Sequence, residues 1–166
     1  MSDVVLRKAR FGDEEALAAI QAGSWQAAFP DMVTDEIMTR YTDHDRLCAM
    51  FHRVIEQGRG TLFLLSVDGA PHCFSWWSPA RDEAFAGWAE ICALHSLPGH
   101  WRQGFGGMMM NAVLQDIRDA GYQQVLLWTF RENARARSFY EAQGFRFTGD
   151  EKNPLGTVEV RYERMV

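Results

Sequence analysis

The chain has 166 residues, of which 47% are hydrophobic and 23% are charged, and its formal net charge is −5. This length can bury the core of one domain, and the composition is ordinary for a globular protein. The acidic balance argues against a general nucleic-acid binder, which would usually be basic. We therefore expect a single domain over residues 3–166 with no nucleic-acid partner.

The cysteines and histidines lack the spacing of a structural cross-link or a metal site. The 3 cysteines form no CxxC pair, and the 5 histidines form no HxxxH pair. The opening stretch MSDVVLRKAR carries no apolar leader, and no apolar run approaches the length of a membrane span. These patterns favour a cytoplasmic protein with no disulfide framework, no metal and no membrane contact.

The first third of the chain reads as a strand followed by helices. Residues 3–10 alternate enough for an opening strand, and Asp13 can cap a helix that runs through about residue 22. A longer helical pattern covers residues 34–57 and is interrupted near YTDHD. Thr42 or Asp43 can cap its second half, so this stretch predicts two helices in succession.

The middle of the chain predicts a hairpin, a strand and a helix. The apolar runs TLFLLSV and HCFSWWS flank Asp68-Gly69, which is a strong hairpin signal. Residues 89–97 predict the next strand, closed by Pro98-Gly99. Apolar side chains then recur at helical spacing from residue 107 to residue 120.

The last part alternates strand and helix again. QVLLWTF reads as a buried strand, residues 134–143 as a short helix, and FRFTG and VEVRYERMV as closing strands. Strands and helices are thus interleaved in an unequal pattern, which predicts an α+β or α/β domain.

A glycine-rich turn precedes the helix that begins near residue 107. In HWRQGFGGMMM, Gly104, Gly106 and Gly107 would let backbone N–H groups and a helix N-terminus face one anion. A P-loop is excluded because Phe105-Gly106 stands where Lys-Ser/Thr is required. The dinucleotide fingerprint fails because Met109 occupies its third glycine position. A glycine-softened turn without a ligand is the remaining alternative.

Two segments resemble the signatures of the GNAT acyltransferases. Residues 102–107 resemble the pyrophosphate loop Q/R-x-x-G-x-G/A, although Trp101 stands at the Q/R position and Arg102 follows it. Residues 133–145, NARARSFYEAQGF, resemble the second signature N-x-x-A-x-x-F-Y-x-x-x-G-F. The resemblance covers essentially the whole chain. It implies an α+β GNAT fold, in which a mixed, mostly antiparallel twisted sheet is flanked by helices and splayed between its two central strands.

The resemblance also implies transfer of an acetyl group from acetyl-CoA to an amine by direct attack in a ternary complex. The glycine loop would hold the pyrophosphate, and the end of the strand over 89–97 would pair with the pantetheine arm. Asn133 resembles a pantetheine-contacting residue, and it could equally serve as a helix N-cap. The implied cofactor-binding residues are Leu94, His95, Ser96, Arg102, Gln103, Gly104, Phe105, Gly106, Gly107, Asn133 and Tyr140.

Two catalytic roles follow from the resemblance. Tyr140 would donate a proton to the leaving thiolate; its alternative role is that of a core aromatic. Glu90 resembles the glutamate base of histone-type members, and its alternative role is that of an exposed strand carboxylate without a catalytic function. His95 is the alternative candidate for the base. Strand alternation would place Glu90, Cys92, Leu94 and Ser96 on one face and His95 on the other.

The acceptor remains open at this stage. SWQAAFPDMV resembles a stretch that overhangs the substrate groove in one GNAT subgroup, so Trp25 and Phe29, with Trp76 and Glu90, are the expected pocket residues. A small-molecule amine is favoured over a peptide or protein amine. A non-catalytic acyl-CoA sensor is a further alternative, and pairing of the final strand would allow a homodimer.

Overall fold

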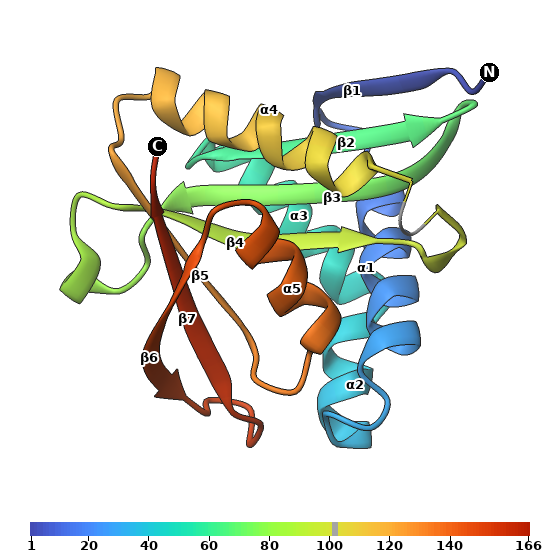
Figure 1. The fold of residues 1–166 in the computed structure, drawn as a ribbon. Helices are drawn as coiled ribbons and strands as arrows, with labels where there is room; N and C mark the ends of the chain where they lie inside the picture. Colours follow the sequence, from blue (N-terminus) through green and yellow to red (C-terminus); the bar gives the residue numbers. More distant parts are fainter. Residues whose placement is uncertain (101–102) are drawn as a thin grey trace.

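The computed structural model of the chain describes residues 1–100 and 103–166, and a 7-stranded sheet organises this described part (Figure 1). The strand order is β1-β2-β3-β4-β5-β7-β6. The strands are β1 (Val4–Lys8), β2 (Thr61–Val67), β3 (Ala70–Pro79), β4 (Ala89–Ser96), β5 (Gln124–Phe130), β6 (Arg146–Lys152) and β7 (Glu159–Met165). Every neighbouring pair is antiparallel except β4 and β5, which run parallel. The expected α+β class and the mixed, mostly antiparallel sheet are confirmed.

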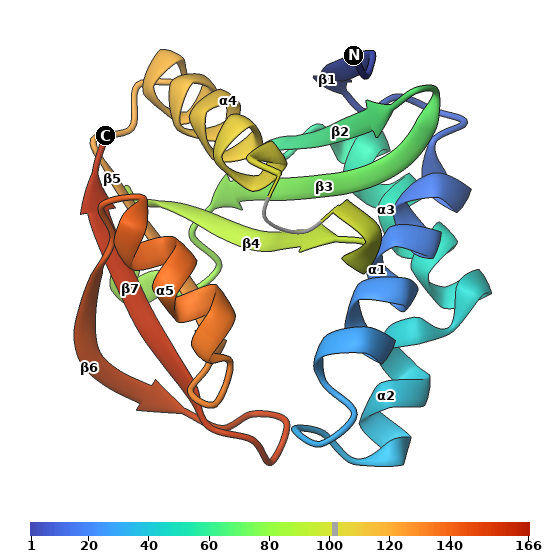
Figure 2. The same cartoon turned by 45° about the vertical axis from the view of Figure 1, so that its right-hand side comes forward.

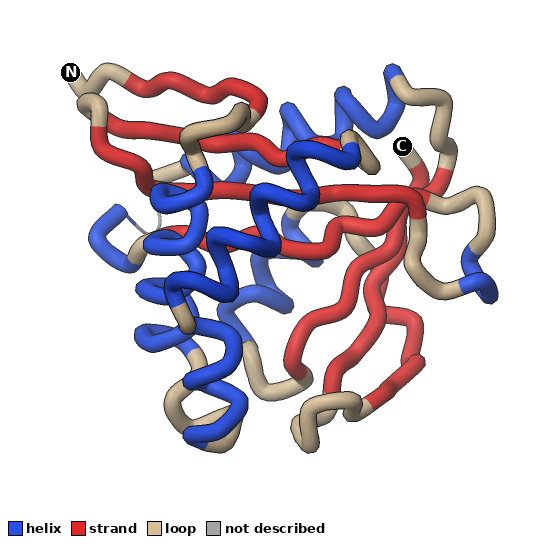
Figure 3. Tube along the Cα trace, turned by 180° about the vertical axis from the view of Figure 1, so that it is seen from behind, coloured by secondary structure: helices blue, strands red, loops and turns tan. Residues whose placement is uncertain are grey.

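Helices cover both faces of this sheet. They are α1 (Glu14–Ala28), α2 (Asp35–Thr42), α3 (His44–Gln57), α4 (Phe105–Asp119) and α5 (Ala134–Ala142), with short 3-10 turns η1 (Glu83–Phe85) and η2 (Pro98–His100). Figures 1 and 2 show α4 and α5 on one face, and Figure 3 shows α1, α2 and α3 on the other. No described helix is both long and apolar enough to cross a membrane.

Two helix boundaries differ from the prediction. Helix α1 continues to Ala28 instead of ending near residue 22, because the added turns bury Ser24 and Trp25 against the rest of the protein. Helix α4 begins at Phe105, before residue 107. In both places tertiary packing extends a helix beyond its local sequence signal.

The predicted break between α2 and α3 is confirmed, and Asp43 provides the cap. Its carboxylate accepts a hydrogen bond of 2.9 Å from the Arg46 backbone N–H. The Thr42 hydroxyl instead donates back to the Met38 carbonyl at 2.7 Å. The N-terminus of α3 is therefore stabilised by a side chain outside the helix, as its sequence predicts.

Among the described residues, the two larger clusters of the hydrophobic core lie as two layers, one on each face of the sheet, and a smaller third cluster contains Trp25, Phe29 and Phe130. Alternate residues of β2 divide between the two layers: Phe63 and Leu65 pack with α4 and α5, while Leu62 and Leu64 pack with α1 and α3. The fully alternating strand thus serves as the wall between the two layers.

The two central strands separate after a short paired stretch. Parallel pairing of β4 with β5 includes only Ala89 with Val125, Glu90 with Leu126 and Ile91 with Leu127. Strand β4 continues to Ser96 and β5 to Phe130, and Figure 2 shows them diverging. The predicted splay is confirmed, and it leaves an edge of β4 open inside the molecule.

A β-bulge changes the face of the residues at this edge. Trp76 pairs with Ala93 and Trp77 pairs with Ile91, so Cys92 is an extra residue in the ladder. As a result Ile91 and Leu94 pack in the same core layer, whereas strict alternation would place them on opposite faces. The prediction that Leu94 shares a face with Glu90 and Cys92 is therefore wrong.

Candidate active site

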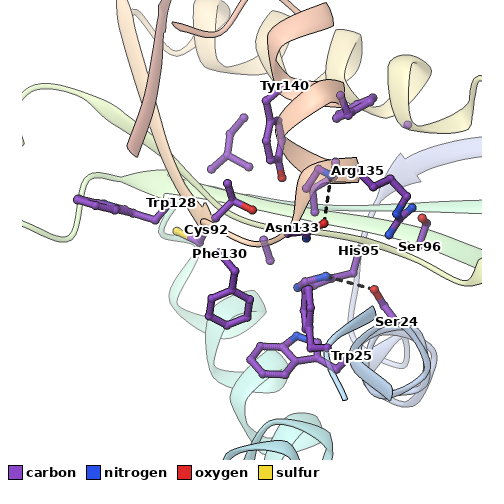
Figure 4. Close-up of a pocket in the computed structure, with 18 of the residues that line it drawn as sticks. Ser24, Trp25, Cys92, His95, Ser96, Trp128, Phe130, Asn133, Arg135 and Tyr140 are labelled. Atoms are coloured by element: carbon purple, nitrogen blue, oxygen red, sulfur yellow. Dashed lines mark hydrogen bonds between the residues drawn. The ribbon is translucent and has the colours of Figure 1, made fainter. Parts of the chain in front are cut away.

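A cavity of about 1020 Å³ lies at the splay (Figure 4). The free end of β4 and the first turns of α4 and α5 line one part of it, and α1 with the strands β5, β6 and β7 lines the other. In Figure 4, Tyr140, Asn133 and Arg135 lie on one side, and Trp25 and Phe130 lie on the opposite side. One continuous space therefore joins the glycine turn to an aromatic wall across the splay.

The glycine turn forms the N-terminus of α4. Gly104 is the N-cap residue with φ 86°, a conformation that glycine adopts without strain. Gly104, Phe105, Gly106 and Gly107 line the cavity, whereas Gln103 does not, and Arg102 lies outside the described residues. Since the first turn of a helix carries N–H groups without intrahelical partners, this wall can bind an anion.

Helices α4 and α5 approach closely at the same place. A Cβ atom added at Gly106 would lie 3.1 Å from the Phe139 ring. The glycine at this position thus leaves room for the second motif to pack beside the first.

The open edge of β4 forms the floor of the cavity. Leu94, His95 and Ser96 all line it, and none of them pairs with β5. Backbone groups on such a strand edge can hydrogen-bond to an extended ligand as an added strand.

Asn133 is the N-cap of α5 and also lines the cavity. Its Oδ1 accepts a hydrogen bond of 3.2 Å from the Ala136 backbone N–H, and the residue is 8% exposed. The capping role is therefore shown, and the contact with pantetheine stays a prediction.

Tyr140 is buried, at 7% exposure, and its hydroxyl points into the cavity in Figure 4. Burial raises the pKa of this phenol well above its ordinary value; nearby Arg135 acts to lower the pKa, and Cys73 to raise it. The phenol stays protonated at neutral pH, which is the state that a general acid needs.

His95 lies in the cavity wall among aromatic rings. Its ring centroid is 5.6 Å from that of Phe74 and 6.4 Å from that of Trp25, and Nδ1 is 3.4 Å from the Ser24 hydroxyl. Burial, with the nearby Arg135 charge, lowers the pKa of His95 to about 4. The imidazole is neutral at pH 7 and is a weak base.

Glu90 is held in an ion pair behind the cavity wall. It is 3% exposed; its Oε1 accepts from the Arg81 backbone N–H at 3.1 Å and from Nε at 3.2 Å, and Oε2 accepts from Nη2 at 2.7 Å. Arg81 lines the cavity and Glu90 does not. Trp76, also expected in the acceptor pocket, packs with the α1–α3 core layer and lies outside the wall.

The two other expected pocket residues do line the cavity. Trp25 stacks on Tyr41 with ring centroids 4.7 Å apart, and Phe29 meets Phe130 edge-on at 5.0 Å. These rings make a rigid apolar wall across the splay from Tyr140.

The polar part of this wall, formed by Glu159 and Lys152, belongs to no motif in the sequence. Glu159, at the start of β7, pairs in register with Phe130 of β5 and with Lys152 of β6. All three line the cavity together with Trp128. Burial raises the pKa of Glu159, while Lys152 and Arg81 act to lower it and Glu90 to raise it. The only sequence signal for Glu159 was its position in an alternating strand.

Among the described residues, no group of three or more His, Cys, Asp or Glu side chains could hold a metal ion.

The comparisons with known proteins identify the chain that carries this cavity as an acetyl-transferring acyltransferase. The chain belongs to the acetyltransferase (GNAT) family, whose family model matches residues 23–145. It is 27% identical to an uncharacterized N-acetyltransferase of Mycobacterium tuberculosis strain H37Rv over 144 residues, which cover 87% of this chain and 90% of the relative.

Solved structures share the fold at low sequence identity. PaiA N-acetyltransferase from Thermoplasma acidophilum, solved in complex with coenzyme A, matches with a TM-score of 0.80 at 17% identity and covers 99% of each chain. An acetyltransferase from Salmonella typhimurium with acetyl-CoA matches at 0.74 and 15% identity, covering 98% of this chain and 93% of that one. A ribosomal-protein-alanine N-acetyltransferase from Brucella melitensis matches at 0.77 and 15%, covering 98% and 99%.

Proposed function

We propose that this protein transfers an acetyl group from acetyl-CoA to a primary amine by direct attack in a ternary complex. The observation that carries the proposal is the continuous cavity through the splay, with the glycine turn at one end and the aromatic wall at the other. Two similar structures hold coenzyme A or acetyl-CoA, which supports the same cosubstrate here.

Acetyl-CoA would be held mainly by backbone groups. The N–H groups of residues 104–107 would bind the pyrophosphate, with Arg102 and Gln103 preceding them in the loop. The pantetheine arm would pair with the open edge of β4 at Leu94, His95 and Ser96, and Asn133 would contact it from α5. Such binding would place the thioester between the splayed strands, beside the Tyr140 hydroxyl.

The chemistry needs one acid, one base and one oxyanion donor. The amine nitrogen attacks the thioester carbon, a free backbone N–H at the splay stabilises the oxyanion, and the C–S bond then breaks. Tyr140 donates its proton to the departing sulfur. The assignment of the base to Glu90 stays a prediction. Arg81 donates hydrogen bonds to both carboxylate oxygens of Glu90, and this pairing disfavours uptake of a proton.

A small-molecule amine is the favoured acceptor. The rings of Trp25, Phe29 and Phe130 enclose the acceptor end, and an apolar wall of this kind suits a compact ligand more than an extended peptide. A peptide or protein amine is the second candidate, favoured by the likeness to a ribosomal-protein-alanine N-acetyltransferase.

Titration calorimetry with acetyl-CoA and an assay of thiol release test the proposal together. We expect saturable binding, and release of free coenzyme A only when an amine from a panel of small amines and peptides is added. Folded protein that binds no acetyl-CoA would disprove the proposal. Saturable binding without turnover of any amine would favour an acyl-CoA sensor instead.

A further inference from the structure

The described wall of the cavity contains a single carboxylate, which belongs to Glu159. Phe130 and Lys152 are its cross-strand partners in β5 and β6, and partners of this kind direct their side chains to the same face of a sheet. The three side chains therefore form a row on the cavity side, continuous with the aromatic wall of Phe29 and Trp25.

The cations near Glu159 already have other partners. The Arg81 guanidinium is engaged by Glu90 at 2.7 Å, and the Lys152 ammonium lies 4.3 Å from the centroid of the Trp128 ring. None of the ion pairs in the described part of the chain includes Glu159. This carboxylate is thus available to a cation that enters the cavity.

The other candidate bases near the splay are less suited to accept a proton. The pKa of His95 is lowered to about 4 by burial, so its imidazole is a weak base. The thiol of Cys92, whose pKa burial raises to about 11, is protonated at neutral pH. Glu90 is paired with Arg81 and lies outside the wall.

We propose that Glu159 receives the ammonium group of the acceptor and takes its proton, directly or through one water, before the amine attacks the thioester. The inference rests on the proposed function and adds to it the base and the acceptor subsite. The proton passes to a carboxylate oxygen, and the nitrogen lone pair forms the new C–N bond. The C–S electrons leave on sulfur, which is protonated by Tyr140, and the second proton of the attacking nitrogen is released as the neutral amide forms and restores the Tyr140 phenol.

Charge at this end of the cavity also defines the acceptor. Arg81 is neutralised by Glu90, and Glu159, the one carboxylate of the described wall, is shared between Lys152 and the acceptor ammonium, so a second cationic group on the acceptor would find no carboxylate to pair with. The rings of Trp25 and Phe29 offer contact to an uncharged body. The acceptor class that fits is a monoamine carried on an apolar or aromatic group.

The pH dependence follows from the groups around Glu159. Burial raises its pKa, Lys152 of β6 and Arg81 after β3 oppose the rise, and Glu90 of β4 adds to it; the protonated Cys92 thiol is neutral. Wild-type kcat/KM should therefore fall in acid as Glu159 becomes protonated. Without this base only the free amine reacts, so the rate should keep rising with pH towards the pKa of the amine.

The test compares Glu159→Gln with Glu151→Gln, using phenethylamine as acceptor. Glu151 is exposed and pairs in register with Val160, the residue after Glu159. Its side chain therefore lies on the opposite face of the β6–β7 pair from Glu159. We expect E159Q to lose about 10²-fold in kcat/KM at neutral pH, with partial recovery in alkali, and E151Q to match wild type. Titration of both variants with acetyl-CoA should give wild-type affinity, which shows that the fold and the cofactor site are intact.

An E159Q pH profile that superimposes on the wild-type profile would overturn the role of Glu159, and so would a loss confined to acetyl-CoA affinity. A shift of the pH profile in Glu90→Gln, with the E159Q profile unaffected, would assign the base to Glu90 instead.

The acceptor class has its own test. We expect kcat/KM for phenethylamine to exceed kcat/KM for cadaverine by at least about tenfold, and the reverse order would overturn the monoamine class. If wild-type protein neither binds acetyl-CoA nor releases thiol, the proposed function itself fails, and the inference fails with it.

Discussion

The ring and the hydroxyl of Tyr140 have separable tasks. The ring packs edge-on against Phe139 and Phe145, with centroids 5.5 and 5.9 Å away. Tyr140→Phe keeps this packing and removes only the proton donor. We expect kcat to fall about 10²-fold, because the thiolate then leaves without an acid, while the Kd for acetyl-CoA changes little. Steady-state kinetics and calorimetry measure the two effects separately, and weaker cofactor binding as the main defect would contradict the acid role.

His95 should make stability depend on pH. Its folded-state pKa of about 4 lies below the ordinary 6.5, so the unfolded chain takes up the proton first. The neutral imidazole contributes its full share of the unfolding free energy at pH values above the ordinary pKa of 6.5. This contribution is lost as the pH falls through the folded-state pKa of about 4. Each pH unit in this window should cost at most ~1.4 kcal/mol of unfolding free energy.

Denaturant unfolding at a series of pH values across that window tests this expectation. His95→Asn keeps a side-chain nitrogen or oxygen near Ser24 and removes the titration, so its unfolding free energy should vary less with pH. An equal pH slope in the variant and in wild type would mean that other groups set the acid sensitivity.

Motif residues were predictable where local spacing encodes a local structure. Asn133 and Tyr140 lie two helical turns apart, which predicts that they share one face of the helix, and both line the cavity. Glu159 could not be found in this way, because its neighbours Phe130 and Lys152 come from two other strands. The pairing of Glu90 with Arg81 is equally invisible in sequence, since a loop brings the guanidinium back over β4.

At the level of elements, the connection between α3 and β2 depends on a close backbone approach. Gly60 has φ 84°, and a Cβ atom there would lie 1.9 Å from the Trp77 carbonyl oxygen. Gly60→Ala must therefore displace β3 or the connection, and we expect it to lower the free energy of unfolding by about 2 to 4 kcal/mol.

Gly58→Ala is the matched control, because Gly58 also has positive φ, at 61°, but no atom lies within 4 Å of its added Cβ. It should cost only about 1 kcal/mol, the strain of the left-handed backbone. Urea denaturation of the two variants separates strain from steric contact. Equal losses would show that the contact with Trp77 relaxes without cost.

Some element boundaries follow local chemistry, whereas the end of α1, the start of α4 and the register within strands follow tertiary contacts. The Asp43 cap was among the caps predicted from sequence, because a cap acts within one turn of the chain. The bulge at Cys92 depends on the register of β4 against β3, which no local pattern specifies. That single extra residue is why Leu94 and Ile91 pack in the same layer and why face assignments along β4 went wrong.

For the whole molecule, the splay divides the sheet into two parts that share few hydrogen bonds. Only the pairs from Ala89 to Ile91 join β4 to β5 in the described structure. The splay itself was predictable through the family resemblance, whereas composition and periodicity indicated only an α+β or α/β domain. Its physical consequence is that a ligand seated between the strands contacts both parts and should stabilise them together.

Hydrogen exchange with coenzyme A gives the corresponding prediction. Amides of residues 92–96 have no partner in β5, so those facing the splay should exchange readily in the free protein and become protected when pantetheine pairs with them. The amides of β2, paired on both sides with β1 and β3, provide the internal reference.

At a coenzyme A concentration of about 100 times its Kd, the ligand adds about 2.7 kcal/mol to the free energy of global unfolding. This effect slows only those amides that exchange through global unfolding. Protection at residues 92–96 should exceed that at β2, because it includes new hydrogen bonds as well as the global effect. Equal protection in both regions would mean that coenzyme A binds without pairing along β4.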